Sequence, residues 1–386
     1  MRIIVLGYIV RGPLAGHAWH HLQYVVGLRR LGHDVYFLED SDDFASCYDP
    51  TTHEMSSEPR YGLRFADMVF SRAGLRDRWA YYDAHSGTWY GPAGAKAIDL
   101  CRGADVCLNV SGVNPLREWL TKIPRRILVD TDPAFTQLRH LTDPRAMESA
   151  LRHNAFMTFG ENFGRSGCTI PDDGLPWQPT RQPIVLDAWP VTPGPHDGNF
   201  STMMQWQSYP DVTFEGSTYG MKSMSFPEYF DIPSKVEARL EVAVGGASAP
   251  REALRAAGWV VRDPLRPSRD PWVYQKFMRE SKAEFSVAKH GYVRTYSGWF
   301  SDRSAEYLAS GRPVIVQETG FSQWLEVHRG VVAFRSPDEA VAAIDRVVRD
   351  YDAHCRAARI VAEAYFDARL VLTSLLDRAS RTVHAA

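Results

Sequence analysis

The first forty residues alternate between two hydrophobic patterns, and this alternation restricts the possible folds more than any other feature. Ile3–Leu6 is short and aliphatic, as in a buried strand, and a glycine-containing loop follows it. Apolar residues then recur with helical spacing over residues 22–31, and Gly32 supplies a stop signal before a second apolar run at Val35–Leu38. Two parallel strands need such a helical crossover, so the start of the chain predicts a βαβ unit.

The same alternation continues through the first half of the chain. Further apolar runs, each short enough for a strand, occur at Trp79–Tyr82, Val106–Val110, Arg126–Val129 and Phe156–Phe159. Helical patterns separate them near Leu63–Ala73, Ala93–Cys101 and Ala146–His153. This order favours an open, mostly parallel sheet with helices on both faces.

A dense group of prolines interrupts the pattern near the middle of the chain. Six prolines stand between Pro176 and Pro195, which marks a linker or an interdomain crossing. Strand and helix patterns then alternate again, and a helical run follows from Ala353 to Arg378. Because 386 residues exceed what one hydrophobic core usually supports, we predict α/β domains at residues 1–185 and 186–352, with a helical segment at 353–386.

Composition excludes some classes of protein. Hydrophobic residues make up 45% of the chain and charged residues 23%, with a formal net charge of −2, which excludes disorder and disfavours strong nucleic-acid binding. The chain has no apolar window of about 18 residues, and its first ten residues are typical of a buried strand rather than a signal peptide. We therefore expect a cytoplasmic protein without an integral membrane segment. Five scattered cysteines, without C-x-x-C spacing, indicate reduced thiols.

The stretch from Lys289 to Gly320 carries the strongest functional signal. Small and polar residues at 301–304 (Ser301, Asp302, Arg303 and Ser304) open a short helix, whose free N–H groups and positive dipole end suit a diphosphate. Arg294 and Arg303 can add contacts to its oxygens. Glu306, one turn inside the helix, can accept hydrogen bonds from the two hydroxyls of a ribose.

A structural role fits the same residues. Ser301 or Asp302 can simply cap the helix, and Glu306 can support its first turn as a capping-box partner. The residue pattern alone leaves both interpretations open.

Two segments resemble a known family. The sequence EYLASGRPVIV, from Glu306 to Val316, resembles the E-x-x-A-x-G-x-P-V signature in the C-terminal half of nucleotide-sugar-dependent glycosyltransferases of the GT-B fold. Residues 16–39, GHAWHHLQYVVGLRRLGHDVYFLE, are similar to their opening loop, helix and second strand. The first signature is fairly specific, whereas the second recurs in many Rossmann-like proteins. The resemblance implies two Rossmann-like domains with mostly parallel sheets that face a central cleft.

The resemblance also implies a reaction. Residues 186–352 would hold a nucleoside-diphosphate sugar as co-substrate, residues 1–185 a small-molecule or polymer acceptor, and the helical segment would pack back across the hinge. Glu306 falls on the family's ribose-binding glutamate, and Ser301–Ser304 fall on its diphosphate-facing helix start. The chain departs from the retaining branch at Gly298, where that branch often has a second glutamate.

An inverting transfer would need a general base, and a histidine can supply it. His17, His20 and His21 stand at the start of the first predicted helix. His17 is favoured because it follows Gly16 at the end of the loop, close to where inverting members often place a base histidine. Each of the three can instead cap the helix, pack or face solvent.

Several charged residues end predicted strands, where ligands of open α/β sheets gather. Asp130 and Asp132 follow one strand, and Asp132 can orient His17 or contact the acceptor. Glu161 follows the next strand as a candidate acceptor-binding residue, and Lys289 ends a strand near the predicted phosphates. Each can also simply terminate a strand or cap a helix.

The remaining polar residues suggest no metal centre and no cofactor. The residues His53, His85, His140 and Asp105 lack metal-ligand spacing, and the D-x-D triplets at 130–132 and 350–352 do not lie by the predicted phosphates. A glycosyltransferase is the leading hypothesis. A nucleotide-sugar epimerase or hydrolase on the same scaffold, and a non-catalytic nucleotide-sugar-binding protein, stay open as alternatives.

Overall fold

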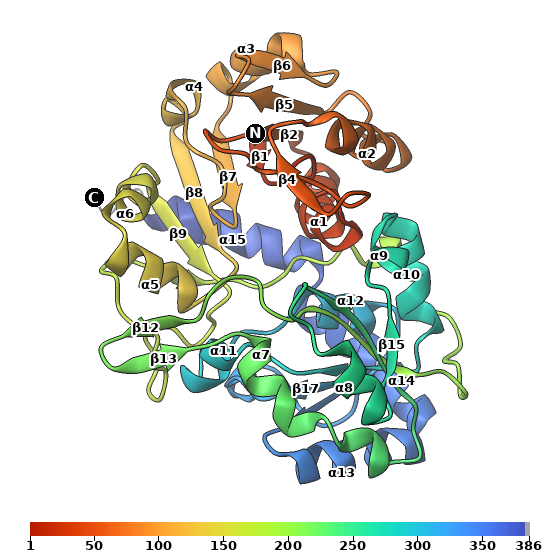
Figure 1. Cartoon of the computed structure of the whole chain (residues 1–386). Helices are drawn as coiled ribbons and strands as arrows, with labels where there is room; N and C mark the ends of the chain where they lie inside the picture. The colour runs from red at the N-terminus through yellow and green to blue at the C-terminus, as the bar shows by residue number, and fades with distance from the viewer. Residues whose placement is uncertain (383–386) are drawn as a thin grey trace.

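The computed structural model describes residues 1–382 and builds them around two large sheets, one in each half of the chain (Figure 1). The first sheet has the strand order β10-β9-β8-β7-β1-β2-β5-β6, and only the β5–β6 pair is antiparallel. Its strands are β1 (Arg2–Leu6), β2 (Asp34–Asp40), β5 (Trp79–Asp83), β6 (Thr88–Tyr90), β7 (Val106–Val110), β8 (Arg125–Asp130), β9 (Ala155–Thr158) and β10 (Gln178–Pro179).

The second sheet is wholly parallel, with the order β15-β14-β11-β16-β17-β18. Its strands are β11 (Phe200–Gln205), β14 (Leu240–Gly245), β15 (Val260–Arg262), β16 (Ala283–Ser286), β17 (Val314–Gln317) and β18 (Val331–Phe334). The prediction of an α/β fold with mostly parallel sheets is confirmed, because these buried strands leave short apolar runs in the sequence.

Helices cover both sheets. Those of the first half are α1 (Ala15–Arg30), α2 (Arg60–Arg72), α3 (Ala97–Arg102), α4 (Glu118–Thr121), α5 (Phe135–Thr142) and α6 (Pro144–Leu151). Those of the second half are α7 (Lys222–Ser225), α8 (Arg251–Ala256), α9 (Leu265–Ser268), α10 (Pro271–Glu280), α11 (His290–Arg294), α12 (Asp302–Ala309), α13 (Pro337–Arg349), α14 (Tyr351–Tyr365) and α15 (Ala368–Thr382). No helix within the described residues has both the length and the hydropathy of a membrane span.

Two antiparallel hairpins interrupt the alternation, and the apolar patterns did not predict them. The first, β3 (Cys47–Asp49) with β4 (Glu54–Ser56), follows β2. The second, β12 (Val212–Phe214) with β13 (Ser217–Tyr219), follows β11 and packs against α5 of the other half. Both are too short and too exposed to leave a clear periodic signal.

The proline-rich crossing is fixed to the second half by two arginines. The fully buried Arg312 donates from Nη1 to the Thr192 carbonyl (2.9 Å) and from Nη2 to the Thr192 hydroxyl (2.8 Å). Arg359 donates from Nη1 to the carbonyls of Trp189 (3.0 Å) and Ala309 (2.8 Å). Because these donors satisfy buried carbonyls of the crossing, the segment has a defined path despite its prolines.

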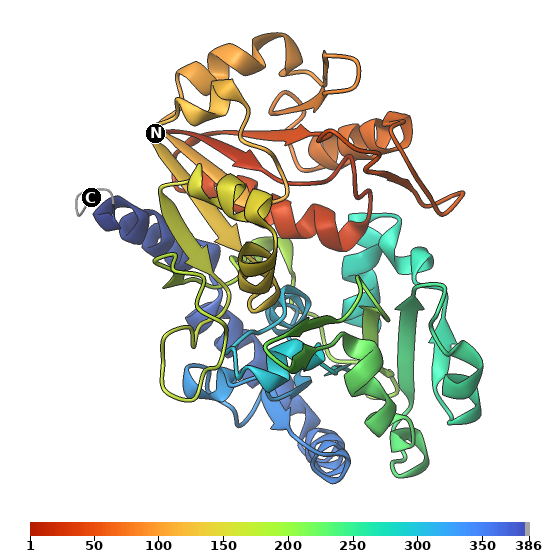
Figure 2. The same cartoon turned by 60° about the vertical axis from the view of Figure 1, so that its left-hand side comes forward.

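The helical run predicted from Ala353 to Arg378 is two helices rather than one. The helix is interrupted at Phe366 and Asp367, between α14 and α15. Here Ile184 N–H donates to the Phe366 carbonyl (2.7 Å) and Ala368 N–H donates to the Ile184 carbonyl (2.9 Å). Figures 1 and 2 show α15 returning to the first half, where it contacts α1. A Cβ at Gly27 of α1 would lie 2.6 Å from Leu372 Cδ1, so glycine allows this close approach without a shift of the leucine side chain.

The two halves also contact each other at two further places, through α1 with α9 and α10, and through α5 with β12 (Figure 2). At the first place, Trp19 of α1 donates from Nε1 to the Pro271 carbonyl (2.8 Å), and Arg72 pairs with Asp270 (2.7 Å). At the second place, Phe135 and Leu138 of α5 share an apolar cluster with residues of β13 and α11. One arrangement of the halves is therefore held by specific contacts.

Candidate active site

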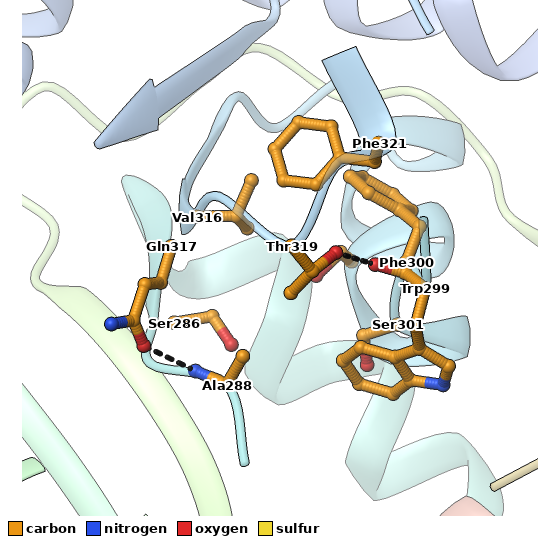
Figure 3. A pocket seen from close by; sticks show the side chains of 10 residues that line it. Ser286, Ala288, Trp299, Phe300, Ser301, Val316, Gln317, Thr319 and Phe321 are labelled. Atoms are coloured by element: carbon orange, nitrogen blue, oxygen red, sulfur yellow. Dashed lines mark hydrogen bonds between the residues drawn. The ribbon is translucent and has the colours of Figure 1, made fainter. Parts of the chain in front are cut away.

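A pocket lies where strands β16 and β17 end and helix α12 begins. Gln317 accepts a hydrogen bond from Ala288 N–H (3.1 Å), and Thr319 donates from its hydroxyl to the Trp299 carbonyl (Figure 3). Besides Gln317, Ala288, Thr319 and Trp299, the pocket is lined by Ser286, Phe300, Ser301, Ser304, Val316 and Phe321. Carboxyl strand ends at this place form the usual ligand crevice of an open α/β sheet.

The start of α12 opens onto this pocket without a cap from its N-cap residue, although Asp302 Oδ1 accepts a hydrogen bond from Arg303 N–H (2.9 Å). Ser301 is the N-cap residue, but its hydroxyl lies 3.3 Å from Asp302 Oδ1 and caps no backbone N–H. Ser304 Oγ is fully buried, lines the pocket and has no hydrogen-bond partner. The positive end of the helix dipole and an unused hydroxyl are thus directed at one place, which suits an anion.

Glu306 does not act as a capping-box partner, because it lies five residues beyond the N-cap Ser301. Its side chain is 1% exposed and lies between α12, α1 and α10, near Gln23 and Tyr274. Burial, followed by the charge of Asp302, raises the pKa of Glu306 well above its ordinary value. The carboxyl group is therefore desolvated at the contact between the halves.

Lys222, which the sequence interpretation missed, places a cation within electrostatic range of Arg303 and Asp302 at the start of α12. Burial and the positive charge of Arg303 lower the pKa of the Lys222 ammonium well below its ordinary value. Within residues 1–382, no hydrogen bond or ion pair reaches this ammonium group. Glu284 and Asp302 act on this half-buried cation without pairing with it, so a bound anion would stabilise its charge. Lys222 follows the unpredicted hairpin, and only the Gly220 turn before it signals a helix start.

Arg303 connects α12 to the strands next to the pocket. Its Nε pairs with the fully buried Glu284 (2.6 Å), its Nη1 donates to the Met203 carbonyl (2.5 Å), and its Nη2 donates to Ser286 Oγ (2.9 Å). Burial opposes the charge, but Glu284 raises the pKa of Arg303 above its ordinary value. The guanidinium therefore ties α12 to β11 and β16, and most of its donors already have protein partners.

Asp132 and Lys289 meet across the two halves. Lys289 Nζ lies 2.9 Å from Asp132 Oδ1 and 2.9 Å from the Tyr209 hydroxyl, and the hydroxyls of Tyr209 and Tyr292 donate to Asp132. Burial alone would raise the pKa of Asp132, but Lys289 and the two hydroxyls lower it. The structure pairs Asp132 with the second half and not with His17, so the predicted orienting role is not what the geometry provides.

The three histidines of α1 have different surroundings. His17 Nδ1 lies 3.1 Å from the Gly12 carbonyl, which fixes the neutral ring with its proton on Nδ1 and its lone pair on Nε2. His20 Nδ1 lies 3.3 Å from Asp302 Oδ2, and the fully buried His21 donates from Nδ1 to the His17 carbonyl (2.7 Å). Burial lowers the pKa of His17. His17 and His20 thus each have an oriented ring with an unused Nε2, and that of His20 is buried.

Tyr8 is a second residue that the sequence interpretation missed. It follows β1 directly, at the point where β1 separates β7 from β2, and its ring packs edge-on against His17 at a centroid distance of 4.7 Å. Burial, then the charge of Asp302, raises the pKa of Tyr8 to about 12, while Ser111 opposes this shift. The phenol is protonated at neutral pH and can donate a hydrogen bond beside His17.

Comparison with known proteins identifies the fold and the family. Residues 234–374 match a protein-family model described as "Glycosyl transferase-like". An alpha-glucosyltransferase solved in complex with UDP-glucose and DNA containing an abasic site superposes with a TM-score of 0.60 at 11% identity, covering 98% of this chain and 99% of that one. The chain has the GT-B fold, and its second half contains a glycosyl transferase-like domain. The predicted family and the predicted enzyme class are therefore confirmed.

Two further solved structures agree with this identification. AviGT4, a glycosyltransferase involved in avilamycin A biosynthesis, superposes with a TM-score of 0.53 at 14% identity over 100% of this chain and 99% of that one. HepE of Anabaena, in complex with UDP, gives a TM-score of 0.54 at 12% identity over 99% of this chain and 100% of that one. No curated protein sequence matches the glycosyltransferase significantly.

Two predicted site residues of the glycosyltransferase have partners outside the pocket lining. Glu161 pairs with Arg181 (2.6 Å), whose guanidinium stacks over the Trp324 ring at 4.5 Å. Arg294 donates from Nη2 to Ser217 Oγ (2.7 Å) on the β12–β13 hairpin. The structure brings neither side chain to the pocket or to His17.

The carboxylates and histidines of the glycosyltransferase are dispersed. Across residues 1–382, no three His, Cys, Asp or Glu side chains are arranged to hold a metal ion together. The charged groups that act electrostatically on Lys222 are Arg303, Glu284, Lys289 and Asp302.

Proposed function

We propose that the glycosyltransferase moves a sugar from a nucleoside diphosphate to a hydroxyl group of a small-molecule or polymer acceptor, between the facing sheet edges and without a metal ion. The observation that carries this proposal is the Lys222 ammonium, which has no hydrogen bond or ion pair within residues 1–382 and lies within electrostatic range of Arg303 and Asp302 at the start of α12. A diphosphate would supply the missing counterion. The known structures support the donor class, because HepE was solved with UDP and the alpha-glucosyltransferase with UDP-glucose.

The donor would be held by three features of the second half. The first backbone N–H groups of α12 and Ser304 Oγ would bind phosphate oxygens, and Lys222 would balance their charge. Arg303 would hold these elements in place from below. Glu306 would accept hydrogen bonds from the ribose hydroxyls once Gln23 and Tyr274 give way.

The transfer itself would use His17 as general base. As the acceptor oxygen bonds to the anomeric carbon, His17 Nε2 takes the acceptor proton, and the bond from that carbon to the phosphate oxygen breaks. The leaving nucleoside diphosphate keeps the bonding electrons, and its charge is stabilised by the α12 start and Lys222. Attack opposite the leaving group inverts the anomeric configuration. The Gly12 carbonyl would stabilise the imidazolium that forms.

A cytoplasmic location fits this proposal. The donor would be a nucleotide sugar, and the five cysteines are all unpaired in the structure, as is usual in a reducing compartment.

A thermal-shift panel of UDP, GDP, ADP, CDP and dTDP, in the presence of EDTA, tests the donor site. A ligand at 100 times its dissociation constant adds about 2.7 kcal/mol to stability, so one diphosphate should raise Tm clearly. Incubation with the matching nucleotide sugars then separates the activities. Diphosphate released only with acceptor supports transfer, release with water alone indicates a hydrolase, an isomerised donor indicates an epimerase, and binding without turnover indicates a non-catalytic protein.

Glu306→Gln should weaken binding of the preferred nucleoside diphosphate by about 10-fold, because an NH2 group replaces one of the two oxygens that can accept from the ribose hydroxyls. The variant keeps the shape of a buried side chain, so Tm should change little. Calorimetric titration of the ribonucleotide and its 2′-deoxy analogue checks the assignment. An equal loss for both ligands would show that Glu306 does not contact the 2′-hydroxyl.

A further inference from the structure

Asn162 comes from the first half of the chain but is buried in the second. It stands in the loop after β9 and is 0% exposed. Its backbone N–H donates to the Ser297 carbonyl (3.1 Å), and its Nδ2 donates to the carbonyls of Tyr296 (3.1 Å) and Gly320 (2.9 Å). One side chain therefore connects two separate loops of the opposite half.

Two glycines make room for this side chain. Gly298 has a φ of 75°, and a Cβ there would lie 2.7 Å from Asn162 Cγ and 2.8 Å from its backbone nitrogen. Gly320 has a φ of 96°, and a Cβ there would lie 2.5 Å from Asn162 Nδ2. Both positions thus combine a left-handed backbone with a lack of space, so other residues would be strained there. Asn162 occupies the space that a side chain at position 298 would need.

The two loops that Asn162 connects are those that line the pocket. Trp299 follows Gly298 and Thr319 precedes Gly320, and both face the pocket in Figure 3. Gly298 N–H donates to the Thr319 carbonyl (2.8 Å), so the loops are also bonded to each other. A change in how Asn162 is seated would therefore be transmitted to the pocket lining.

We propose that Asn162 is a positioning residue of the donor site, supplied by the opposite half of the enzyme. It fills the side-chain space of position 298 and sets the loops that carry Trp299 and Thr319. Its docking couples the arrangement of the two halves to the shape of the pocket. This inference rests on the proposed function in taking the pocket as the donor site.

Three variants test the proposal. Asn162→Ala removes the two side-chain hydrogen bonds, and Asn162→Asp keeps the size but places a carboxylate against two carbonyl oxygens. Asn154→Ala is the matched control, because Asn154 bonds only within the first half, to Arg126 N–H (2.8 Å) and the Pro124 carbonyl (2.8 Å). Hydrogen exchange of residues 295–301 and 317–324 is measured in the free protein, and calorimetry gives the affinity for the most stabilising diphosphate of the panel.

We expect faster exchange in both loops and about 10-fold weaker diphosphate binding for Asn162→Ala, with an equal or larger effect for Asn162→Asp. The control should leave both quantities unchanged. Near wild-type behaviour of Asn162→Asp would mean that the side chain only fills space, and faster exchange with unchanged affinity would mean that it does not position the donor site. Either result overturns the proposal. If the wild type binds none of the five diphosphates, the proposed function fails, and the positioning role stands or falls on the exchange rates alone.

Discussion

Replacement of His17 by alanine is expected to lower turnover by roughly 100- to 10,000-fold while donor affinity stays close to that of the wild type. The proton passes to His17 only on the way to the transition state, so its loss affects chemistry and not ground-state binding. Steady-state rates with a nucleotide sugar, combined with calorimetric titration of the nucleoside diphosphate, measure the two effects separately. His33→Ala, in the loop that follows the same helix, serves as the control.

The pH dependence gives a second test of the same residue. A base must be neutral to accept a proton, and burial lowers the pKa of His17 below 6.5. The rate should therefore stay constant through neutral pH and fall only as the pH drops through the lowered pKa of His17. This decrease at acidic pH should be absent in His17→Ala. Retention of anomeric configuration in the product, measured by proton NMR, would remove His17 from the mechanism.

Lys222→Met should weaken nucleoside diphosphate binding by about 10- to 150-fold, as expected for the loss of charged hydrogen bonds to phosphate. The free protein should be no less stable than the wild type. Because the folded-state pKa of Lys222 is lowered, burial of the charged amine costs stability at neutral pH, and an apolar side chain of similar length removes that cost. Affinity and Tm should thus move independently, which a loss of packing could not produce.

Lys276→Met is the matched control for this variant, because Lys276 lies exposed on α10 and pairs only with Glu280 (3.5 Å). Thermal melts and calorimetry of both variants with the same ligand make the comparison. Unchanged affinity in Lys222→Met would show that the diphosphate binds elsewhere.

The fold could be predicted because its signals are local. The strand over Val106–Val110 has the predicted bounds, since a strand buried on both faces leaves a continuous apolar run. The helix after Ser301 was expected for a similar reason, because small polar residues precede it and Gly311 ends it. The interruption after Phe366 has no glycine or proline signal. It arises from hydrogen bonds to Ile184, which is remote in sequence.

The candidate site was harder to predict because its residues depend on distant partners. Arg303 was expected to face phosphates, but Glu284 and Met203 use its donors, and neither lies near it in the sequence. Asp132 was expected to orient a histidine or contact the acceptor, yet Lys289 and two tyrosines of the other half surround it. The sequence did not indicate a role for Lys222, because a single lysine after a hairpin belongs to no recognisable motif. Its role emerges only when burial and the absence of a partner in residues 1–382 are considered together.

Calorimetric titration of the nucleoside diphosphate panel into the wild-type enzyme, in buffer with EDTA, tests the central claim most directly. The account predicts that one diphosphate binds with 1:1 stoichiometry in the absence of divalent metal, and that its parent nucleoside binds at least 10-fold more weakly because Lys222 and the α12 start interact with the phosphates. Binding only after addition of a divalent metal would contradict the metal-independent site. The absence of binding by all five diphosphates, with or without metal, would contradict the nucleotide-sugar donor itself.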